Sequence, residues 1–455
     1  MTTGAGLALG CGIGWRPEID AVIAELPEIG FVEVIAENVD PDRLPPGLVE
    51  LRARGVPVIP HGVSLNLGGA DRPERPRLAR LAAVAEALGA PLVSEHMAFC
   101  RVGALDSGHL LPVPRTREAL AVIVRNVRAA RAALPVPLAL ENVAPLLGWP
   151  DDELTEGQFV GELVERADVG LLLDVANLHT ARVNLGLADP LRELDELPLE
   201  RLAYVHVAGG VLRHGLWHDT HTHPLAGPVL DLLAAAASRV DLPGFLLERD
   251  GAYPSAAGLA AELAQIRATV ASASPPTVGS PSPSRLSPDR PPVDRPSPDR
   301  AMTAAAAPAL SSGGRALSSG GRASRRPGRD SWAGWGRAAL GRSTPGGEGD
   351  RRKLGRAQRA LLAALVAGAP LPAGFDADRV EAQAAALVEK RLWGVAHRLP
   401  DLVDQLDGRF PHLFRDYAAG TPRPPGGLLA DARAFAAFAA RHLGPGGAAV
   451  PGRRV

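Results

Sequence analysis

A stretch dense in histidine, between Tyr204 and His223, carries the clearest candidate chemistry in the chain. Its sequence is YVHVAGGVLRHGLWHDTHTH, and Asp219 lies among its histidines. Imidazole and carboxylate groups together are a common ligand set for first-row metals. Such a tract binds metal only where further ligands converge on it, and otherwise it is a solvated loop. Five of the 12 histidines fall here, namely His206, His214, His218, His221 and His223.

The first 271 residues alternate between short apolar runs and longer segments with helical spacing. Continuous apolar strands that alternate with helices indicate a parallel sheet covered on both faces. Eight such units in this length predict an α/β fold, the (β/α)₈ or TIM barrel. An open doubly wound sheet is the alternative, but no G-x-G-x-x-G follows the first run. The expected strands are 7–13, 31–38, 56–62, 91–96, 137–142, 170–177, 203–209 and 244–250, and the expected helices are 18–26, 40–54, 77–88, 116–134, 155–167, 190–197, 228–239 and 256–271.

Polar residues end nearly every one of these runs. In a TIM barrel the carboxyl ends of all strands meet on one face, where active sites lie. A single ionisable strand end can be a structural ion pair, but here Arg249 is the only basic residue beside many acceptors, so a divalent metal is the simplest explanation. The residues at the strand ends are Glu37, Asn38, His61, Glu95, His96, Glu141, Asn142, Asp174, Asn177, His206, Glu248 and Asp250, and Asp219 and His221 follow on the loop after the seventh strand.

The donor types narrow the choice of metal. The set contains histidine, carboxylate and amide but no thiolate, which disfavours structural zinc, calcium and magnesium. Mixed nitrogen and oxygen sites suit iron, manganese, catalytic zinc or cobalt. The number of candidate ligands is sufficient for two or three ions.

The remaining sequence divides into a linker and a second domain. Residues 272–349 are rich in Pro, Ser, Gly and Arg and repeat ALSSGGR, which predicts a disordered linker. Residues 350–445 return to helical spacing and predict a small all-α interaction domain, on which His397, His412 and His442 are expected at the surface.

Charge and cysteine content limit the partners and the compartment. A formal net charge of −1 gives no pull towards nucleic acid or membrane. The N-terminus has no basic region before a short apolar run, so we expect no signal peptide and a cytoplasmic protein. Two cysteines, Cys11 and Cys100, are too few for a disulfide framework and are expected to be buried free thiols.

Ten motifs in order resemble those of the multinuclear non-haem iron-dependent oxidative enzymes, which include the methanobactin-biosynthesis oxidase. They are GWRPEI, FVEVIAEN, HGVSLNLGG, SEHMAF, HLLPVPRT, LALEN, GLLLDVANLH with Asn184 after it, VHVAGG, DTHTHP and LLERD, within residues 7–255. The resemblance implies a TIM barrel, in agreement with the count of strands. It also implies two or three iron ions, Fe2+ or Fe3+, bound by His61, His96, Glu141, Asp174, Asn177, His206, Asp219, His221 and Glu248.

The resemblance implies an activity as well. Enzymes of this family use O₂ to oxidise residues, often cysteine, of ribosomally synthesised precursor peptides, and one iron would bind the substrate thiolate and lower its pKa. Glu141 and Asp174 are the expected bridges between metals, and His96 and His221 are expected to be essential for catalysis. Family members commonly act with a small helical partner that presents the peptide, and the 350–445 domain resembles such a partner fused in cis.

Two positions depart from the family pattern, and other functions stay open. Ala176 stands where the family usually has Asn, and Gly210 where it usually has His, but neither is an expected ligand. A zinc- or manganese-dependent hydrolase or isomerase on the same barrel is one alternative. An endonuclease of this kind would need a basic groove, and a sugar isomerase usually needs a lysine, which no strand end offers. A non-catalytic metal-binding protein is the other alternative.

Overall fold

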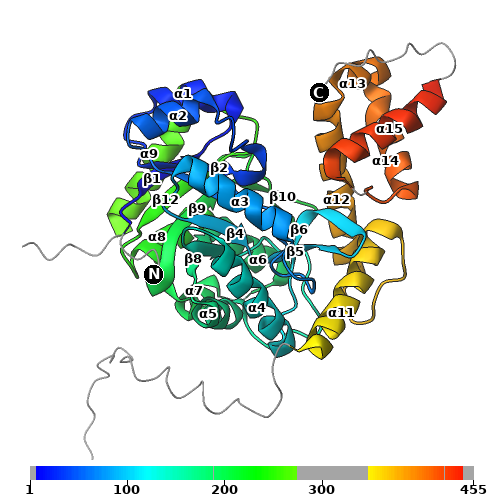
Figure 1. The fold of residues 1–455 in the computed structure, drawn as a ribbon, viewed down its shortest axis with the longest axis horizontal. Coiled ribbons are helices and arrows are strands. Elements are labelled where there is room, and N and C mark those ends of the chain that lie inside the picture. Colours follow the sequence, from blue (N-terminus) through cyan, green and yellow to red (C-terminus); the bar gives the residue numbers. More distant parts are fainter. Residues whose placement is uncertain (1–6, 188, 274–346, 425, 444–455) are drawn as a thin grey trace, which may run out of the picture. The chain divides into compact units, whose positions relative to one another are not determined.

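A closed barrel of eight parallel strands forms the first part of the chain. The computed structural model describes residues 7–187, 189–273, 347–424 and 426–443. The strands neighbour one another in the order β1-β12-β9-β8-β7-β4-β3-β2, which confirms the predicted barrel. Figure 1 shows the barrel strands with helices around them. They are β1 (Gly10–Gly14), β2 (Phe31–Ile35), β3 (Val58–Gly62), β4 (Val93–His96), β7 (Leu138–Glu141), β8 (Gly170–Asp174), β9 (Leu202–Ala208) and β12 (Gly244–Glu248).

Helices follow the strands, and local capping signals explain where several of them begin. Thr155 accepts a hydrogen bond from the Gln158 backbone and forms a capping box with it at the start of α5. Thr116 accepts from the Ala119 backbone at the start of α4. The helices are α1 (Asp20–Glu25), α2 (Pro46–Ala53), α3 (Arg75–Leu88), α4 (Arg117–Ala133), α5 (Glu156–Ala167), α6 (Val175–Leu185), α7 (Pro190–Glu196), α8 (Gly227–Ala237) and α9 (Ala256–Ala273).

The expected boundaries were wrong near the site. The run 170–177 was predicted as a strand, but β8 ends at Asp174 and α6 begins at Val175, because the Asp174 carboxylate caps the helix by accepting from the Asn177 backbone. Two hairpins were also missed, β5 (Ala98–Val102) with β6 (Leu105–Pro112) and β10 (Gly210–Arg213) with β11 (Leu216–Asp219). The second closes through His214 and Gly215, both with positive φ, as a two-residue hairpin turn requires.

An apolar cluster fills the lower half of the barrel, meaning the half nearer the amino ends of the strands. Its residues come from the first half of each strand or lie just before it. On most of these strands, a polar side chain of the site follows two residues later. Phe31 precedes Glu33, and Ile59 precedes His61 in this way. Because side chains of a strand alternate between its two faces, the residue two positions on points to the same side. The cluster comprises Leu9, Phe31, Ile59, Leu92, Ala139, Leu172, Ala203, Tyr204 and Leu246.

The C-terminal helices form two packing regions. Val395, Phe410, Phe414 and Phe435 belong to a core of their own, in which the buried Arg391 guanidinium pairs with Asp431. The helices are α11 (Glu348–Ala367), α12 (Ala377–Arg398), α13 (Pro400–Leu406), α14 (Phe410–Gly420) and α15 (Gly427–Leu443).

Helix α11 packs against the barrel rather than into that separate core. Leu361, Leu362 and Leu365 belong to the main core cluster, which includes the barrel helices. The buried Gln358 side chain accepts from the Ala70 backbone at 2.9 Å and donates to the Gly68 carbonyl at 2.8 Å. The division proposed from sequence, 1–271 and 350–445, stays a proposal, and residues 274–346 of the proposed linker lie outside the described residues.

The sequence also predicts which cysteine and histidine side chains are buried or exposed, and whether a helix could span a membrane. Cys11 and Cys100 are buried free thiols as predicted, and His397, His412 and His442 are exposed. Among the residues that the structure describes, no helix is both long and apolar enough to cross a bilayer.

Replacing Gln358 with Ala should lower the free energy of unfolding by about 1–3 kcal/mol, because it leaves the buried Ala70 amide and Gly68 carbonyl without their partners. Urea denaturation of the full chain measures the change. The matched control is Gln265→Ala on the exposed surface of α9, expected within about 0.5 kcal/mol of the wild type. Equal stability of Gln358→Ala and the control would contradict the role given to this amide.

Candidate metal centre

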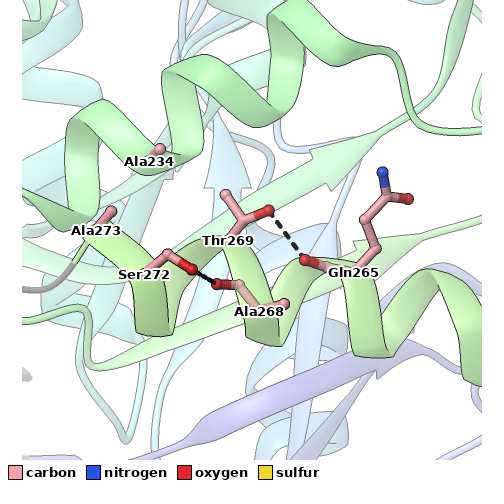
Figure 2. A pocket seen from close by; sticks show the side chains of 6 residues that line it. All are labelled: Ala234, Gln265, Ala268, Thr269, Ser272 and Ala273. Carbon is pink, nitrogen blue, oxygen red and sulfur yellow. Dashed lines mark hydrogen bonds between the residues drawn. The ribbon is translucent and has the colours of Figure 1, made fainter.

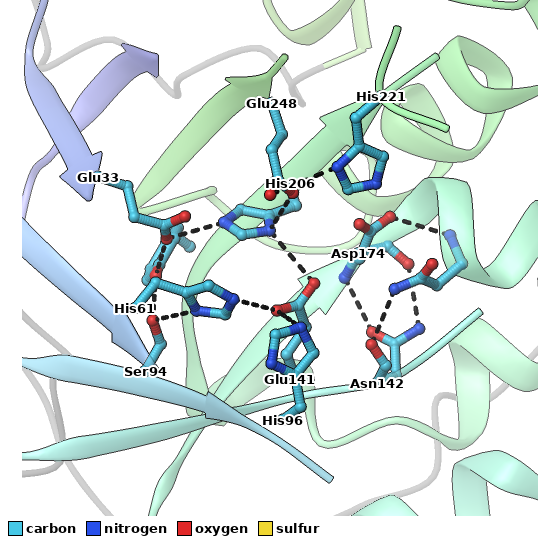
Figure 3. Close-up of polar contacts among 12 residues, drawn as sticks. Glu33, His61, Ser94, His96, Glu141, Asn142, Asp174, His206, His221 and Glu248 are labelled. Atoms are coloured by element: carbon cyan, nitrogen blue, oxygen red, sulfur yellow. Dashed lines mark hydrogen bonds and ion pairs between the residues drawn. The ribbon is translucent and has the colours of Figure 1, made fainter. Parts of the chain in front are cut away.

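The carboxyl ends of the barrel strands bring nearly all predicted ligands together (Figure 3). Parallel strands in register place their last residues at one height, so His96 of β4 pairs with Glu141 of β7, and Asp174 of β8 pairs with His206 of β9. The β10–β11 hairpin adds Asp219, and His221 follows it. Four groups of side chains have ligand atoms within 4.8 Å of one another: His61, His96 and Glu141; Glu141, Asp174, His206 and Glu248; Asp174, Asp219 and His221; and His221, Glu248 and Asp250.

Glu141 lies at the centre of the first two groups. Its Oε2 atom is 3.2 Å from His61 Nε2 and 3.2 Å from His96 Nε2, while its Oε1 atom is 3.2 Å from His206 Nδ1. Asp174 likewise belongs to two groups. This overlap supports the proposal that Glu141 and Asp174 bridge metals, because each carboxylate has two oxygens to share.

His221 and Glu248 connect the remaining groups. His221 Nε2 is 2.6 Å from Asp219, and its Nδ1 atom is 3.4 Å from Glu248 and 3.3 Å from Asp250. Asp250 also pairs with the buried Arg16 guanidinium. Asp250 was noted at a strand end but was not among the predicted ligands, and the structure places it in the fourth group.

Several buried polar atoms of the site have no hydrogen-bond partner among the described residues. Some of these atoms contact oppositely charged groups, such as Glu141 Oε2 beside His61 and His96, but so many buried acceptors without hydrogen bonds favour the binding of a cation. Their donor types, imidazole nitrogen with carboxylate and amide oxygen, fit iron, manganese or catalytic zinc. The atoms are Glu141 Oε2, Asp174 Oδ2, Asn177 Oδ1, Asp219 Oδ1 and His221 Nδ1.

Charge coupling within the site shifts the pKa values strongly. Burial lowers the pKa of His96, but the carboxylates of Glu141 and Glu95 outweigh it and raise that pKa to about 9. Burial alone would raise the pKa of Glu141, but the neighbouring His96 and His206 hold it at about 2. Burial raises the pKa of Asp174 well above its usual range, and Asp219 and Glu141 raise it further. Without metal, protons on the histidines therefore balance Glu141 and Glu248, whereas the raised pKa of Asp174 favours its own protonated form.

A hydrogen-bond chain below the ligands ends on Glu33, a buried carboxylate in the middle of β2 (Figure 3). His61 Nδ1 contacts the Ser94 hydroxyl at 2.8 Å, Ser94 contacts the Tyr204 hydroxyl at 2.8 Å, and Tyr204 donates to Glu33. Glu33 Oε2 also lies 2.9 Å from His206 Nε2.

This chain of hydrogen bonds determines which ring nitrogen of His61 and of His206 carries a hydrogen. If each hydroxyl passes its hydrogen towards Glu33, His61 carries its hydrogen on Nδ1 and leaves the Nε2 lone pair facing Glu141. His206 then donates from Nε2 to Glu33, and its Nδ1 atom would be free to bind a metal. Without metal, the raised pKa of His206 keeps a hydrogen on Nδ1 as well, towards Glu141 and Glu248. One carboxylate thus orients two proposed ligands, as partners of metal-bound histidines usually do.

Sequence reasoning missed Glu33 and Tyr204 because both lie inside a strand rather than at its end. A signal was present, since Glu33 and His206 are the only acidic or basic residues inside the otherwise apolar runs FVEVI and YVHV. Conversely, Glu95 was noted at a strand end, but its two oxygens accept from the Leu65 and His96 backbone amides, which gives it a structural role.

Asn142 and Asn177 hold the end of β8 in place. Asn142 accepts from the Asp174 amide at 2.8 Å and donates to the Asp174 carbonyl at 3.1 Å. Asn177 Nδ2 donates to the Asn142 carbonyl, which orients its Oδ1 atom as the free acceptor. Asn177 as a ligand therefore stays a proposal, supported by this orientation.

Gly210, one of the departures from the family pattern, has no room for a side chain. A Cβ atom there would lie 2.5 Å from the Trp217 indole and 2.6 Å from the His218 carbonyl. The indole of Trp217 packs edge-on against His179 and occupies the space beside Gly210.

A separate recess lies between α8 and α9, and Figure 2 shows its lining. Its side chains are small or uncharged, including Ala234, Gln265 and Thr269, and it holds none of the proposed ligands. Thr269 and Ser272 donate their hydroxyls to carbonyls of their own helix, so they offer no convergent groups to a ligand.

Comparison with known proteins agrees with the site. Residues 10–271 match the family described as RiPP precursor modification enzyme MbnB/TglH/ChrH, and residues 355–441 match the SCO6045-like C-terminal domain. A UPF0276 protein of Streptomyces avermitilis is 50% identical over 435 residues, covering 94% of this chain and 87% of that protein. A UPF0276 protein of Chromobacterium violaceum is 36% identical over 264 residues, covering 58% of this chain and 95% of that protein.

Similar solved structures cover little more than half of the chain. Endonuclease IV from Thermus thermophilus has 21% identity and a TM-score of 0.40, over 58% of this chain and 100% of that one. The 3-keto-D-glucoside 4-epimerase YcjR from E. coli has 14% identity and a TM-score of 0.39, over 57% of this chain and 99% of that one.

Replacing Glu33 with Gln should weaken metal binding about tenfold or more, because the carboxylate that fixes the hydrogens of His61 and His206 is lost. Tyr204→Phe should have a smaller effect, since it breaks only the branch to His61. Competition with a chromophoric chelator for Fe(II) under argon measures affinity without turnover. Glu193→Gln, which changes a buried carboxylate bonded to the Gly157 amide, is the control. Wild-type affinity in Glu33→Gln would refute the orienting role.

The metal-free protein should lose stability as the pH rises from about 6.5 to 9. The folded-state pKa of His96, about 9, exceeds its ordinary 6.5, so protonation favours folding below 6.5 and this contribution disappears as pH passes 9. We expect a loss on the order of 1–3 kcal/mol, and a smaller one with metal bound, because the cation replaces the proton. Urea denaturation with chelator across this range tests it, and a metal-free protein that gains stability would contradict it.

Proposed function

Because the chain belongs to the family of RiPP precursor modification enzymes described as MbnB/TglH/ChrH, we propose that it oxidises a ribosomally synthesised precursor peptide with O₂ at a cluster of two or three irons. Cysteine is the proposed target residue. The observation that carries the proposal is the set of overlapping ligand groups, in which Glu141, Asp174, His221 and Glu248 each belong to two groups.

The donor set supports iron over metals that prefer other ligands. All the groups consist of histidine and carboxylate, with Asn177 as a further oxygen donor, and this composition suits iron in either of its common oxidation states. The protein's own thiols do not compete. Burial raises the pKa of Cys11 to about 11 and that of Cys100 to about 12, so neither is a thiolate at neutral pH.

The residues of the site divide into proposed metal ligands and residues that support them. His61, His96, Glu141, Asp174, Asn177, His206, Asp219, His221 and Glu248 would hold the irons. Bound iron supplies redox chemistry with O₂ and lowers the pKa of a coordinated substrate thiol. Arg16 keeps Asp250 ionised beside His221, since the hydrogen bond to His221 and the Arg16 charge help to hold the Asp250 pKa at about 2 against burial. Electrons and protons removed from the peptide are taken up by O₂.

The C-terminal helices are proposed to present the peptide to the barrel. A module in the same chain raises the effective concentration of a bound peptide at the metal centre without any new contact. The packing of α11 against the barrel supports this arrangement, because buried contacts join the first of these helices to the barrel.

Incubation of an iron-loaded enzyme with a cysteine-containing candidate peptide should change the peptide mass only when O₂ is present. His96→Ala and His221→Ala should each reduce the product at least about a hundredfold, because each removes a proposed ligand. The exposed His412→Ala variant is the control. Mass spectrometry of the peptide with and without O₂, alongside elemental analysis of the protein, gives the readout.

The same experiment separates the alternatives. A zinc- or manganese-dependent hydrolase would change the peptide mass equally well without O₂ and would carry zinc or manganese in stoichiometric amount. A non-catalytic metal-binding protein would carry metal and leave every peptide unchanged. Either result would overturn the oxidase.

A further inference from the structure

Helix α12 of the C-terminal part carries a lysine to the loops around the metal centre. Lys390 Nζ lies 2.9 Å from Nδ1 of His109, which is on β6 in the β5–β6 hairpin. Arg423 also reaches this hairpin and pairs with Asp106 at 3.0 Å, so the hairpin and the C-terminal helices are held together at two points. Lys390 is itself an exposed residue, and its ammonium group is held by the contact with His109.

Helix α12 also reaches the strand ends directly, because the Trp393 ring lies 4.0 Å from the position of a Cβ atom on Gly251, which follows Asp250. Burial lowers the pKa of Lys390, and the carboxylates of Asp250, Asp219 and Glu248 act in the opposite direction. Burial, Lys390 and the nearby His96 and His221 lower the pKa of His109 well below its usual range.

His109 is neutral and leaves most of the hydrogen-bonding capacity of the lysine unused. A neutral His109 can accept from the ammonium only through the Nδ1 lone pair, so its hydrogen is on Nε2. The ammonium has three N–H donors, of which His109 uses one. Among the described residues no carboxylate forms an ion pair with Lys390, which is an exposed residue. Two donors are therefore left for a ligand near the metal centre.

A second side chain of α12 lies on the same side of the helix. Trp393 follows Lys390 by three residues, a spacing that puts both on one helix face. Its ring is 4.0 Å from the position that a Cβ atom on Gly251 would take, directly after Asp250. Trp393 is 55% exposed, which is unusual for so large an apolar side chain. The face of α12 towards the strand ends thus combines a cation with a partly exposed aromatic ring, against which His397 also packs.

We propose that Lys390, held by His109, binds a carboxylate of the peptide substrate next to the metal centre. The proposal deepens the proposed function, on which it rests for the peptide nature of the substrate. A carboxylate fits because it is an acceptor-only anion that can use the two free N–H donors, and a charge-assisted hydrogen bond of this kind is stronger than a neutral one. The exposed Trp393 ring provides an apolar surface for the adjoining part of the peptide.

The carboxylate can come from the C-terminus of the peptide or from an acidic side chain, and three probe peptides separate these sources. They are acetyl-Gly-Cys-Gly with a free carboxylate, the same peptide as an amide, and acetyl-Asp-Cys-Gly as an amide. Binding to the Fe(II)-loaded full chain is measured by calorimetry under argon, so no turnover is needed. Failure of the oxidase proposal, seen as no O₂-dependent product, is therefore distinguishable from failure of this subsite.

Wild-type protein should bind at least one carboxylate-bearing probe about tenfold more tightly than the neutral amide, and Lys390→Met should abolish that preference. Lys390→Arg should keep most of it, because the cation remains. The matched control is Arg398→Met, which removes an exposed cation from the same helix. Preference for the free acid would assign the C-terminal carboxylate, and preference for the Asp probe the side chain.

Two results would overturn the subsite. One is equal binding of all three probes by the wild type. The other is an undiminished preference in Lys390→Met, which would assign the carboxylate to the metals themselves.

Discussion

The concentration of carboxylates at the carboxyl ends of the barrel strands is the constraint on which the rest of this structure depends. Glu141, Asp174 and Glu248 are almost wholly buried, and each lies at the last residue of its strand. Desolvated negative charges must be balanced by positive charge within a few ångströms. Histidinium groups provide this balance without metal, and divalent or trivalent cations do so with it. The site is therefore a set of groups that exchange protons for metal, and its affinity for metal depends on pH.

The strands of the barrel fix the positions of these carboxylates. Most apolar residues of the cluster in the lower half of the barrel are followed two positions later by a polar residue of the site, so the core that stabilises the fold also fixes the height of the ligands. Glu33 belongs to the layer directly above the apolar cluster. Its negative charge is acceptable there because Tyr204 and His206 both donate to it. Rigid elements and a supporting layer behind the proposed ligands are what a metal site requires for preorganisation.

Sequence reasoning predicted the barrel, the strand ends and the convergence of the ligands because these follow from patterns that repeat along the chain. Apolar runs that end in His, Glu or Asp are visible without coordinates, and strand register then brings them together. What could not be predicted depends on pairings between distant segments. Asp174 ends the strand early because its carboxylate caps α6, a competition between two local structures that the run GLLLDVAN does not reveal. The hairpins around residues 98–112 and 210–219 were hidden because their alternation is short and interrupted by glycine.

Composition alone does not reveal how the C-terminal helices pack. The segment that begins α11 resembles any amphipathic helix, yet its leucines belong to the main core of the protein, and Gln358 supplies partners to two backbone groups of the loop at Gly68 and Ala70. A helix fixed in this way gives α12 a fixed starting point, and α12 carries Lys390 and Trp393 to the face where the strands end. No strand end contributes a lysine, and Lys390 is the proposed substrate-binding cation, supplied by a helix far along the chain. A cation added from outside the barrel can recognise substrate without competing for the carboxylates that the metals need.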